Sequence, residues 1–156
     1  MSNKTIIVSG GFDPIHAGHI KMIQAAAFLG KVIVALNSDD WLKRKKGYVF
    51  MPYKSRAYLL QHIKGVHEVY AVDDTDGTVC EALSRLKPDM FGNGGDRTPE
   101  NTPEVNLCKE LNINTVWNLG GNKIQSSRGL INTLFASKPA KSEMDDFKRL
   151  LEDIFE

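Results

Sequence analysis

The sequence predicts an α/β protein, a single doubly wound domain with a five-stranded parallel sheet and an added C-terminal helix. Its length of 156 residues suits one domain with one core. Short apolar runs alternate along the chain with longer segments of helical period. The apolar runs are continuously hydrophobic, which is typical of strands buried in a parallel sheet that helices cover on both faces.

The apolar runs predict strands at Thr5–Val8, Lys31–Leu36, Glu68–Val72, Met90–Gly92 and Thr115–Asn118. Each parallel pair needs a crossover connection, and the segments between the runs have the length and period of helices. We expect these crossover helices at Ile20–Leu29, Tyr53–Ile63, Thr78–Leu86 and Pro103–Leu111. A shorter helical stretch, Arg128–Leu134, follows the last strand.

The C-terminal region predicts a linker and a separate helix. Proline and small polar residues interrupt the helical period in Phe135–Lys141. We therefore divide the chain into a domain at 1–136 and a linker with an amphipathic helix at 137–156. Two interpretations of the helix stay open, because its apolar stripe either packs on its own domain or forms a subunit interface. The stripe consists of Met144, Phe147, Leu150, Leu151, Ile154 and Phe155.

Composition excludes several classes of protein. A formal net charge of +1 argues against a nucleic-acid binder held by a broad basic face. No apolar run approaches the ~18 residues that a membrane span needs, and the N-terminus leads directly into a strand, so we expect no export or membrane insertion. Cys80 and Cys108 lie in no metal-type or redox pairing, and reduced thiols suit a cytoplasmic protein.

The loop between the first strand and the first helix carries the strongest functional signal. Gly10 and Gly11 let the backbone approach a phosphate closely, and a helix N-terminus attracts anions. His16 and His19 are neighbours on the helix if it begins near Gly18, which leaves space between the imidazoles. Two hydrogen-bond donors for a phosphate are favoured over two metal ligands or a purely structural pair, because a zinc site wants a third ligand and no third His or Cys lies nearby.

The segment from Gly10 to His19 resembles the signature of the cytidylyltransferase-like nucleotidyltransferases, whose motif is His, any residue, Gly, His. Within that superfamily the chain is similar to the adenylyltransferase domain that makes nucleotide-activated heptose and to glycerol-3-phosphate cytidylyltransferase. The resemblance covers about residues 4–133. It continues in the family's order through Ala35–Asp39, Lys45–Gly47, Arg56, Val66–Val69, Lys87–Asp89, Gly94–Asp96 and Gln125–Ser127.

The resemblance implies a Rossmann-like fold and transfer of a nucleotidyl group to a phosphate, with release of pyrophosphate. Such an acceptor phosphate is largely ionised near neutral pH, because its second pKa is about 6, so the reaction needs donors that spread negative charge and no general base. The residues implied as catalytic are His16, His19 and Lys46. Those implied as nucleotide-binding are Gly10, Gly11, Phe12, Gly18, Arg56, Gly95, Asp96, Gln125, Ser126 and Ser127.

Several of these residues also have a structural interpretation. The basic run Lys43–Lys46 could be a solvated helix end, and Arg56 could form an ion pair on a helix surface. Asp96 could cap a turn, and the Ser126–Ser127 pair could cap a helix as well as hold phosphate oxygens. Asp13 could bind magnesium through water or hold the loop by hydrogen bonds to its own backbone.

We therefore expect a cytoplasmic enzyme that transfers CMP from CTP to a small phosphorylated or phosphonate-bearing acceptor, with Mg²⁺ as the companion of the triphosphate. One alternative is an adenylyltransferase that uses ATP and a sugar 1-phosphate of the ADP-heptose type. An alternative of another class is a non-catalytic nucleotide-binding regulatory domain. We expect no nucleic-acid or membrane partner, and the resemblance implies a homodimer.

Overall fold

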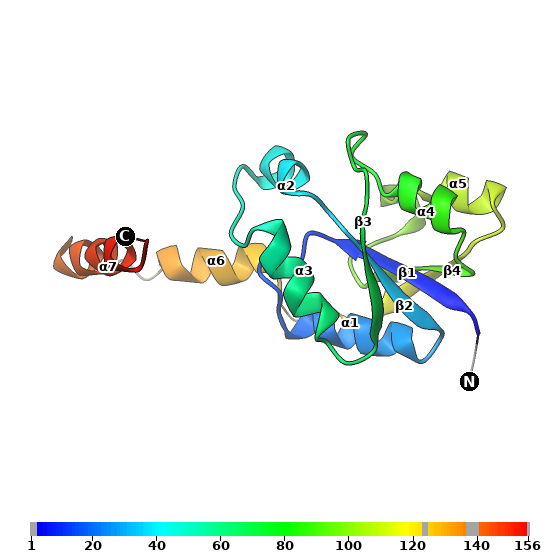
Figure 1. Cartoon of the computed structure of the whole chain (residues 1–156), viewed down its shortest axis with the longest axis horizontal. Helices are drawn as coiled ribbons and strands as arrows, with labels where there is room; N and C mark the ends of the chain where they lie inside the picture. The colour runs from blue at the N-terminus through cyan, green and yellow to red at the C-terminus, as the bar shows by residue number, and fades with distance from the viewer. Residues whose placement is uncertain (1–2, 123–124, 137–140, 156) are drawn as a thin grey trace.

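A computed structural model describes residues 3–122, 125–136 and 141–155. Its centre is a parallel sheet of five strands in the order β3-β2-β1-β4-β5 (Figure 1). The predicted fold class is confirmed, and β1 and β4 lie side by side at the point where the strand order reverses. The strands are β1 (Thr5–Gly10), β2 (Lys31–Leu36), β3 (Val66–Ala71), β4 (Met90–Gly94) and β5 (Asn114–Leu119).

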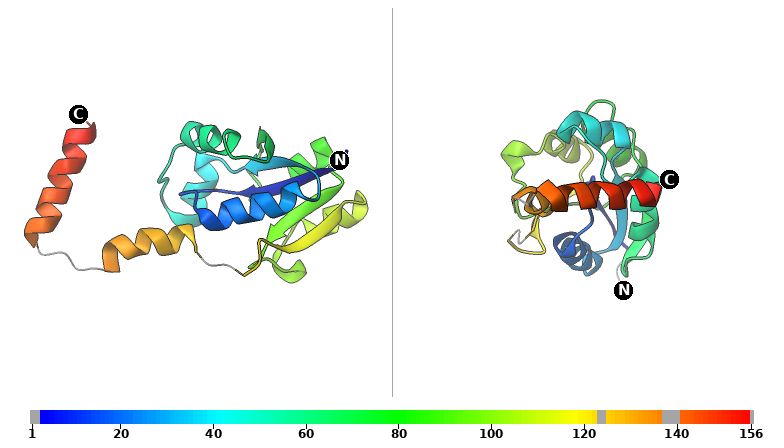
Figure 2. Two further views of the ribbon diagram at one scale, coloured as in Figure 1. Left: turned by 90° about the horizontal axis from the view of Figure 1, so that it is seen from below. Right: turned by 90° about the vertical axis from the view of Figure 1, so that its left-hand side faces the viewer.

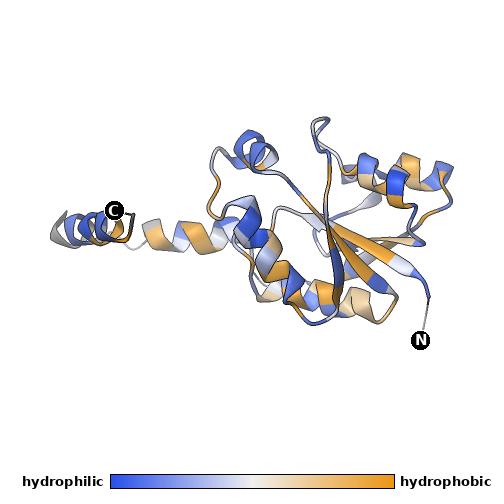
Figure 3. Ribbon diagram, viewed as in Figure 1, coloured by the Kyte–Doolittle hydropathy of each residue, from blue (hydrophilic) through white to orange (hydrophobic). Residues whose placement is uncertain are grey.

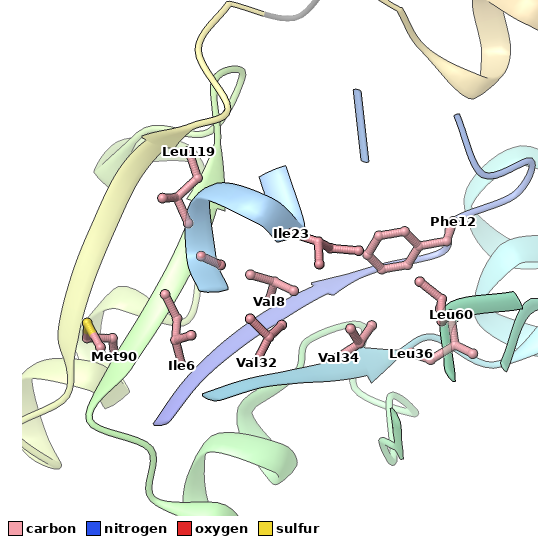
Figure 4. Close-up of a cluster of buried hydrophobic side chains, with 11 residues drawn as sticks. Ile6, Val8, Phe12, Ile23, Val32, Val34, Leu36, Leu60, Met90 and Leu119 are labelled. Atoms are coloured by element: carbon pink, nitrogen blue, oxygen red, sulfur yellow. The ribbon is translucent and has the colours of Figure 1, made fainter. Parts of the chain in front are cut away.

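Helices cover both faces of the sheet. On one face α1 (Ala17–Ala27) and α3 (Tyr53–Gln61) pack on Ile6, Val8 and their neighbours in the first core cluster (Figure 4). On the other face α4 (Cys80–Leu86) and α5 (Val105–Glu110) pack on the second cluster, which contains Ile7. Successive residues of a strand point to opposite faces. The continuous hydrophobicity of β1 is thus explained by burial on both sides.

Helix α2 (Asp39–Lys46) was not predicted. Only Leu42 is buried among its residues, so its sequence shows too little apolar period to indicate a helix. Its ends stabilise it instead: the Ser38 side chain accepts a hydrogen bond from the Trp41 N–H at 3.0 Å, and Gly47 closes it with a φ of 85°. Two acidic residues in the first turn and four basic residues in the last complement the helix dipole.

Some predicted boundaries needed correction near the site. Helix α1 begins at Ala17 rather than Ile20, and β1 and β4 each run on to a glycine, Gly10 and Gly94. A short 3₁₀ helix, η1 (Pro99–Asn101), precedes α5, which begins at Val105 rather than Pro103. The loop that follows β1 is therefore shorter than the sequence indicated, and the connection after β4 contains a 3₁₀ helix that was not predicted.

The C-terminal helices α6 (Ser127–Ala136) and α7 (Lys141–Phe155) extend away from the sheet (Figures 1 and 2). Phe135, Ala136 and Lys141 belong to these helices, which narrows the predicted linker to 137–140, outside the described residues. Leu150, Leu151 and Ile154 are exposed, so for these stripe residues the interpretation of packing on the same domain is wrong. Hydrophobic positions also occur along α6, which extends away from the sheet (Figure 3). The structure does not describe the side chains of Met144, Phe147 and Phe155. No helix in the described ranges combines the length and apolar character of a membrane span.

The two cysteines are free thiols, as expected. Cys108 is the completely buried residue of α5, and burial raises the pKa of its thiol to about 11. Burial likewise raises the pKa of the Cys80 thiol. Both side chains therefore stay protonated near neutral pH, which makes them poor nucleophiles and poor metal ligands.

Candidate active site

A cavity of about 340 Å³ opens at the carboxyl ends of β1, β4 and β5. Its volume lies in the usual range for small-molecule sites, and an open parallel sheet binds ligands at this edge, beside the strand-order reversal. The walls come from the loop after β1, helix α2, the loops after β4 and β5, and the start of α6. Every predicted site residue except Arg56 lines this cavity.

His16 and His19 form a reciprocal cap at the start of α1. Nδ1 of His16 accepts a hydrogen bond from the Gly18 N–H at 3.1 Å, and Nδ1 of His19 accepts one from the His16 N–H at 3.2 Å. The two rings stack with their centroids 3.7 Å apart. Because each Nδ1 acts as an acceptor, the neutral tautomer carries its hydrogen on Nε2. The backbone thus turns both imidazoles into Nε2–H donors.

Gly18 is required by the position of the His16 ring. A Cβ atom built on Gly18 would lie 2.9 Å from Cε1 and 3.0 Å from Nδ1 of that ring. Gly18 therefore makes room for the His16 ring, but the predicted space between the imidazoles is not found, because the two rings stack on each other. The methyl group of an alanine here would push the ring away and break its hydrogen bond to the backbone.

We expect Gly18→Ala to separate activity from stability. Alanine is favoured over glycine in a helix by up to ~1 kcal/mol, which offsets part of the strain, so the melting temperature should change by only a few degrees. The displaced imidazole should lower kcat by about tenfold or more, since a misplaced donor loses its transition-state contact. Thermal unfolding and steady-state kinetics on the same sample check both parts. Unchanged kcat would show that the ring position is unimportant.

The glycines before the histidines allow close packing of the loop. A Cβ on Gly11 would lie 2.6 Å from Cδ2 of Leu42, so the loop packs directly against α2. A Cβ on Gly10 would lie 3.2 Å from the Phe12 ring, which is buried and has its centroid 4.7 Å from that of His19. Phe12 therefore supports His19 from the core side, where it joins the first core cluster (Figure 4).

Asp13 anchors the segment after α2. Its carboxylate accepts hydrogen bonds from the Phe50 N–H at 2.7 Å and the Met51 N–H at 2.6 Å. The carboxylate also lies 3.5 Å from the ammonium group of Lys46, which donates to the Asp13 carbonyl oxygen. The structural interpretation of Asp13 is thus the one observed, although its backbone partners are distant in sequence instead of local.

The magnesium interpretation of Asp13 is not supported. Its side chain is completely buried, and both carboxylate oxygens already accept backbone hydrogen bonds. In the part of the chain that the structure describes, no group of three His, Cys, Asp or Glu residues could hold a metal ion. The described residues therefore do not fit a metal bound by the protein itself.

Arg56 does not line the cavity. Its guanidinium is completely buried and donates from Nη1 to the carbonyl oxygens of Gly11 and Asn37, each at 2.8 Å. Nε donates to the Met51 carbonyl oxygen at 2.8 Å, and Nη2 pairs with Asp39 at 2.6 Å. These bonds join the loop after β1, the loop after β2 and the start of α3, so Arg56 holds the site together instead of presenting its charge to the cavity.

Asp74 is a positioning residue that the sequence analysis missed. Its buried carboxylate accepts hydrogen bonds from Ser38, from N–H and Oγ at 2.7 Å each, and from Nδ2 of Asn37 at 3.1 Å. Ser38 is the N-cap of α2, which carries Lys46 into the cavity. Only the fold brings the loop after β3 against the loop after β2, so the sequence held no local signal for this contact.

The loops after β4 and β5 meet at the opposite wall. A Cβ on Gly95 would lie 2.5 Å from the Gly121 carbonyl oxygen, so a side chain does not fit there. Further along, the Ser126 Oγ accepts from the Gly129 N–H at 2.9 Å, which confirms the capping role. The Ser127 Oγ donates to the Pro14 carbonyl oxygen at 2.7 Å and so ties the start of α6 to the first loop.

The cavity is electropositive although the whole chain is nearly neutral. Both the N-terminus of α1 and that of α6 open onto it, and helix N-termini carry partial positive charge. Only Lys46 among its basic residues was a predicted site residue. The basic lining residues are Lys21, Lys45, Lys46, Arg97 and Arg128, against the two acidic residues Asp13 and Asp96. This arrangement is suited to a polyanion such as a nucleoside triphosphate.

Comparison with known families decides the classification. The family model described as cytidylyltransferase-like matches residues 7–133, which include every residue that lines the cavity and all of the sheet except the first two residues of β1. The chain belongs to this family. That membership places it among the nucleotidyltransferases and confirms the resemblance that the first loop indicated.

Relatives and a solved structure agree with membership of the cytidylyltransferase-like family. The bifunctional protein HldE of Nitratiruptor sp. is 35% identical over 113 residues, which are 70% of this chain and 24% of the relative. The HldE protein of Streptomyces coelicolor is 39% identical over 110 residues, 68% of this chain and 23% of the relative. The chain thus spans about a quarter of the length of these curated relatives. The lipopolysaccharide core biosynthesis protein of Thermoplasma volcanium has the same fold, with a TM-score of 0.64 at 21% identity over 74% of this chain and 95% of that one.

Proposed function

We propose that the domain at 1–136 is an adenylyltransferase that transfers AMP from ATP to a sugar 1-phosphate of the ADP-heptose type and releases pyrophosphate. The observation that carries this proposal is the pair of stacked imidazoles, held as Nε2–H donors in an electropositive cavity at the strand-order reversal. The similarity to HldE proteins favours ATP over the CTP that the sequence analysis expected. Because ATP is a cytoplasmic metabolite, we also propose that the reaction is cytoplasmic.

In the proposed reaction an oxygen of the acceptor phosphate attacks the α-phosphorus of ATP. A new P–O bond forms there, while the bond to the oxygen that bridges the α- and β-phosphates breaks and its electrons leave with pyrophosphate. No general base is needed, because the acceptor phosphate is already ionised with a second pKa of about 6. The barrier falls instead because fixed donors stabilise charge that builds on the phosphates.

We propose that different residues of the cavity stabilise charge on different phosphates. The Nε2–H groups of His16 and His19 would donate to oxygens of the α-phosphate and of the bridging region. Lys46 would neutralise charge on the attacking or leaving phosphates, since it lines the same cavity. The helix N-terminus at Ser126 and Ser127 would hold the β- and γ-phosphates with backbone N–H groups.

Magnesium would enter with the triphosphate. Mg²⁺ keeps several waters and binds chiefly through substrate phosphates in many nucleotide sites, so it needs few protein ligands. This matches a cavity whose described residues offer hydrogen-bond donors and positive charge instead of a metal site. We propose that Mg²⁺ is bound as part of MgATP.

A substrate panel tests the function. Purified protein is incubated with ATP or CTP and with heptose 1-phosphate or glycerol 3-phosphate, and pyrophosphate release is measured. We expect the highest kcat/KM with ATP and heptose 1-phosphate. A preference for CTP with glycerol 3-phosphate would restore the cytidylyltransferase interpretation. Binding of a nucleotide without turnover of any acceptor would support the non-catalytic regulatory alternative.

We also propose a homodimer in which a second copy covers the exposed apolar residues of α7. Leu150 is 56% exposed and Ile154 is 65% exposed, and both belong to the predicted apolar stripe. Burying such side chains contributes about 25 cal/mol per Å² of apolar surface. Light scattering coupled to size exclusion should give twice the chain mass for the wild type and the monomer mass for Ile154→Glu. A monomeric wild type would contradict this proposal.

A further inference from the structure

Arg97 and Glu104 form a charged pair at the cavity wall for which neither the sequence analysis nor the proposed reaction has a role. Arg97 follows β4 and lines the cavity, with one third of its side chain exposed. Glu104 lies immediately before α5 and is buried. Nη1 of Arg97 lies 3.8 Å from Oε2 of Glu104, which is an ion-pair distance but too long for a hydrogen bond.

The Glu104 carboxylate is only half satisfied by hydrogen bonds. Its Oε1 accepts from the Val79 N–H at 3.1 Å, which connects it to the start of α4. Its Oε2 is buried without a hydrogen-bond partner among the described residues. A buried carboxylate oxygen is costly unless a positive charge compensates it. The guanidinium of Arg97 supplies this positive charge. The attraction between the two groups holds Arg97 at this part of the cavity wall.

The backbone around Arg97 is held in place from both sides. The Arg97 N–H donates to the Gly94 carbonyl oxygen at 3.2 Å, and Asn101 Nδ2 donates to the Asp96 carbonyl oxygen at 3.2 Å. The Thr98 N–H donates to Oδ1 of Asn101 at 2.8 Å. Within the described residues the guanidinium makes the Glu104 ion pair and no hydrogen bond. A fixed loop therefore presents an arginine whose donors can bind an oxyanion.

The sheet order indicates which substrate Arg97 meets. Strand β1, with the histidine loop, lies between β2 on one side and β4 and β5 on the other. Helix α2 with Lys46 follows β2, whereas Arg97 follows β4, two residues after Gly95, which packs against the loop after β5. The residues expected to hold the nucleotide, Asp96 and Ser126, are both on the β4–β5 side. Arg97 is on the same side.

We propose that Arg97 binds a phosphate oxygen of the nucleotide and that Glu104 is the residue that positions it. This assignment rests on the proposed function, because it assumes that the cavity binds a nucleoside triphosphate. Arg97 then supplies a bidentate, permanently charged donor opposite Lys46, across the histidine pair. Glu104 acts through Arg97, since its buried carboxylate keeps the guanidinium at the wall before the nucleotide enters.

Calorimetric binding of MgATP and of inorganic pyrophosphate, without any acceptor, tests this assignment. Loss of a charge-assisted contact typically weakens binding about 10- to 100-fold, so we expect an increase of this size in the Kd of Arg97→Met for both probes. Arg97→Lys should recover part of the lost affinity, because lysine keeps the positive charge but cannot form the bidentate hydrogen bonds of a guanidinium. Arg85→Met, which removes an exposed arginine of α4 outside the cavity, is the matched control and should bind both probes as the wild type does.

A double-mutant cycle tests the role of Glu104. If Glu104 acts only by positioning Arg97, Glu104→Gln weakens MgATP binding in the wild type but causes no further loss in Arg97→Met. A further loss there would show that Glu104 is merely structural and overturn its positioning role. Because Glu104 is buried, far-UV circular dichroism must first show that Glu104→Gln is folded; if it is not, the arginine variants decide alone.

The failures of the two proposals are distinguishable. Normal binding of both probes by Arg97→Met, beside a wild type that binds them, overturns the assignment of Arg97 and leaves the proposed function intact. Weaker MgATP binding with unchanged pyrophosphate binding overturns a contact to the β- or γ-phosphate, the two groups that pyrophosphate reproduces. A wild type that binds neither MgATP nor MgCTP overturns the proposed function, and this assignment with it.

Discussion

Replacing His16 with asparagine is expected to lower kcat about 100- to 1,000-fold, the usual effect of losing one donor that stabilises transition-state charge, while leaving the protein stable. The expectation depends on the two roles of this side chain. Its Nδ1 caps α1 by accepting from the Gly18 N–H, and its Nε2–H is the proposed donor to the α-phosphate. Asparagine is among the best N-cap residues, so it replaces the cap but not the imidazole donor.

His19→Ala gives the complementary case. It removes the second donor and also the acceptor for the His16 N–H, so His16 loses a hydrogen bond that fixes its backbone. We expect a similar fall in kcat and a modest loss of stability, of about 1 kcal/mol for the lost hydrogen bond. Because the two rings act as one stacked unit, the double variant should lose less than the product of the single effects.

Pyrophosphate release under saturating substrates and denaturant unfolding measure these effects side by side. An exposed histidine outside the cavity, His67, provides the control as His67→Asn and should leave kcat unchanged. A His16→Asn enzyme with full kcat would remove the central support of the proposed mechanism. A large loss of stability in that variant would instead mean that its low activity reflects unfolding.

Replacing Arg56 with methionine is expected to destabilise the fold by about 3–5 kcal/mol, because each carbonyl oxygen that loses its buried donor costs about 1–3 kcal/mol. The guanidinium donates to the carbonyl oxygens of Gly11, Asn37 and Met51 and pairs with Asp39. Methionine fills a similar volume but donates no hydrogen bond, so three carbonyl oxygens lose their partner in a buried site. The melting temperature should fall by about 10 °C or more.

This result separates two roles for Arg56. A phosphate ligand would be expected at the cavity surface, and its loss would weaken nucleotide binding with little change in stability. A residue that joins three loops loses stability first, and activity falls because the first loop and α2 shift. Unfolding in urea with and without MgATP measures both, and Lys54→Met on the exposed side of α3 is the control. Unchanged stability with lost nucleotide binding would restore the phosphate-ligand interpretation.

The accuracy of the sequence predictions follows the kind of interaction involved. The strands and the helices packed on them were predicted because buried residues impose an apolar pattern on the chain, and β2 was predicted to the residue. Helix α2 was not predicted, because Leu42 is its one buried residue and the helix depends on its caps and charges. Likewise Asp13 and Arg56 have the residue types of functional groups, and nothing local distinguishes a buried ion-pair partner from a ligand of a phosphate.

The sequence by itself determined the order of elements, the phosphate-binding character of the first loop and the family of the protein. These properties depend on local periodicity and on residues close together in the chain, such as Gly18 between His16 and His19. Only the tertiary structure decided that Arg56 is buried and joins neighbouring loops by hydrogen bonds, that Asp74 holds the N-cap of α2, and that Arg97 lines the cavity beside Glu104. Such roles depend on burial and on contacts between distant segments, which no local pattern encodes.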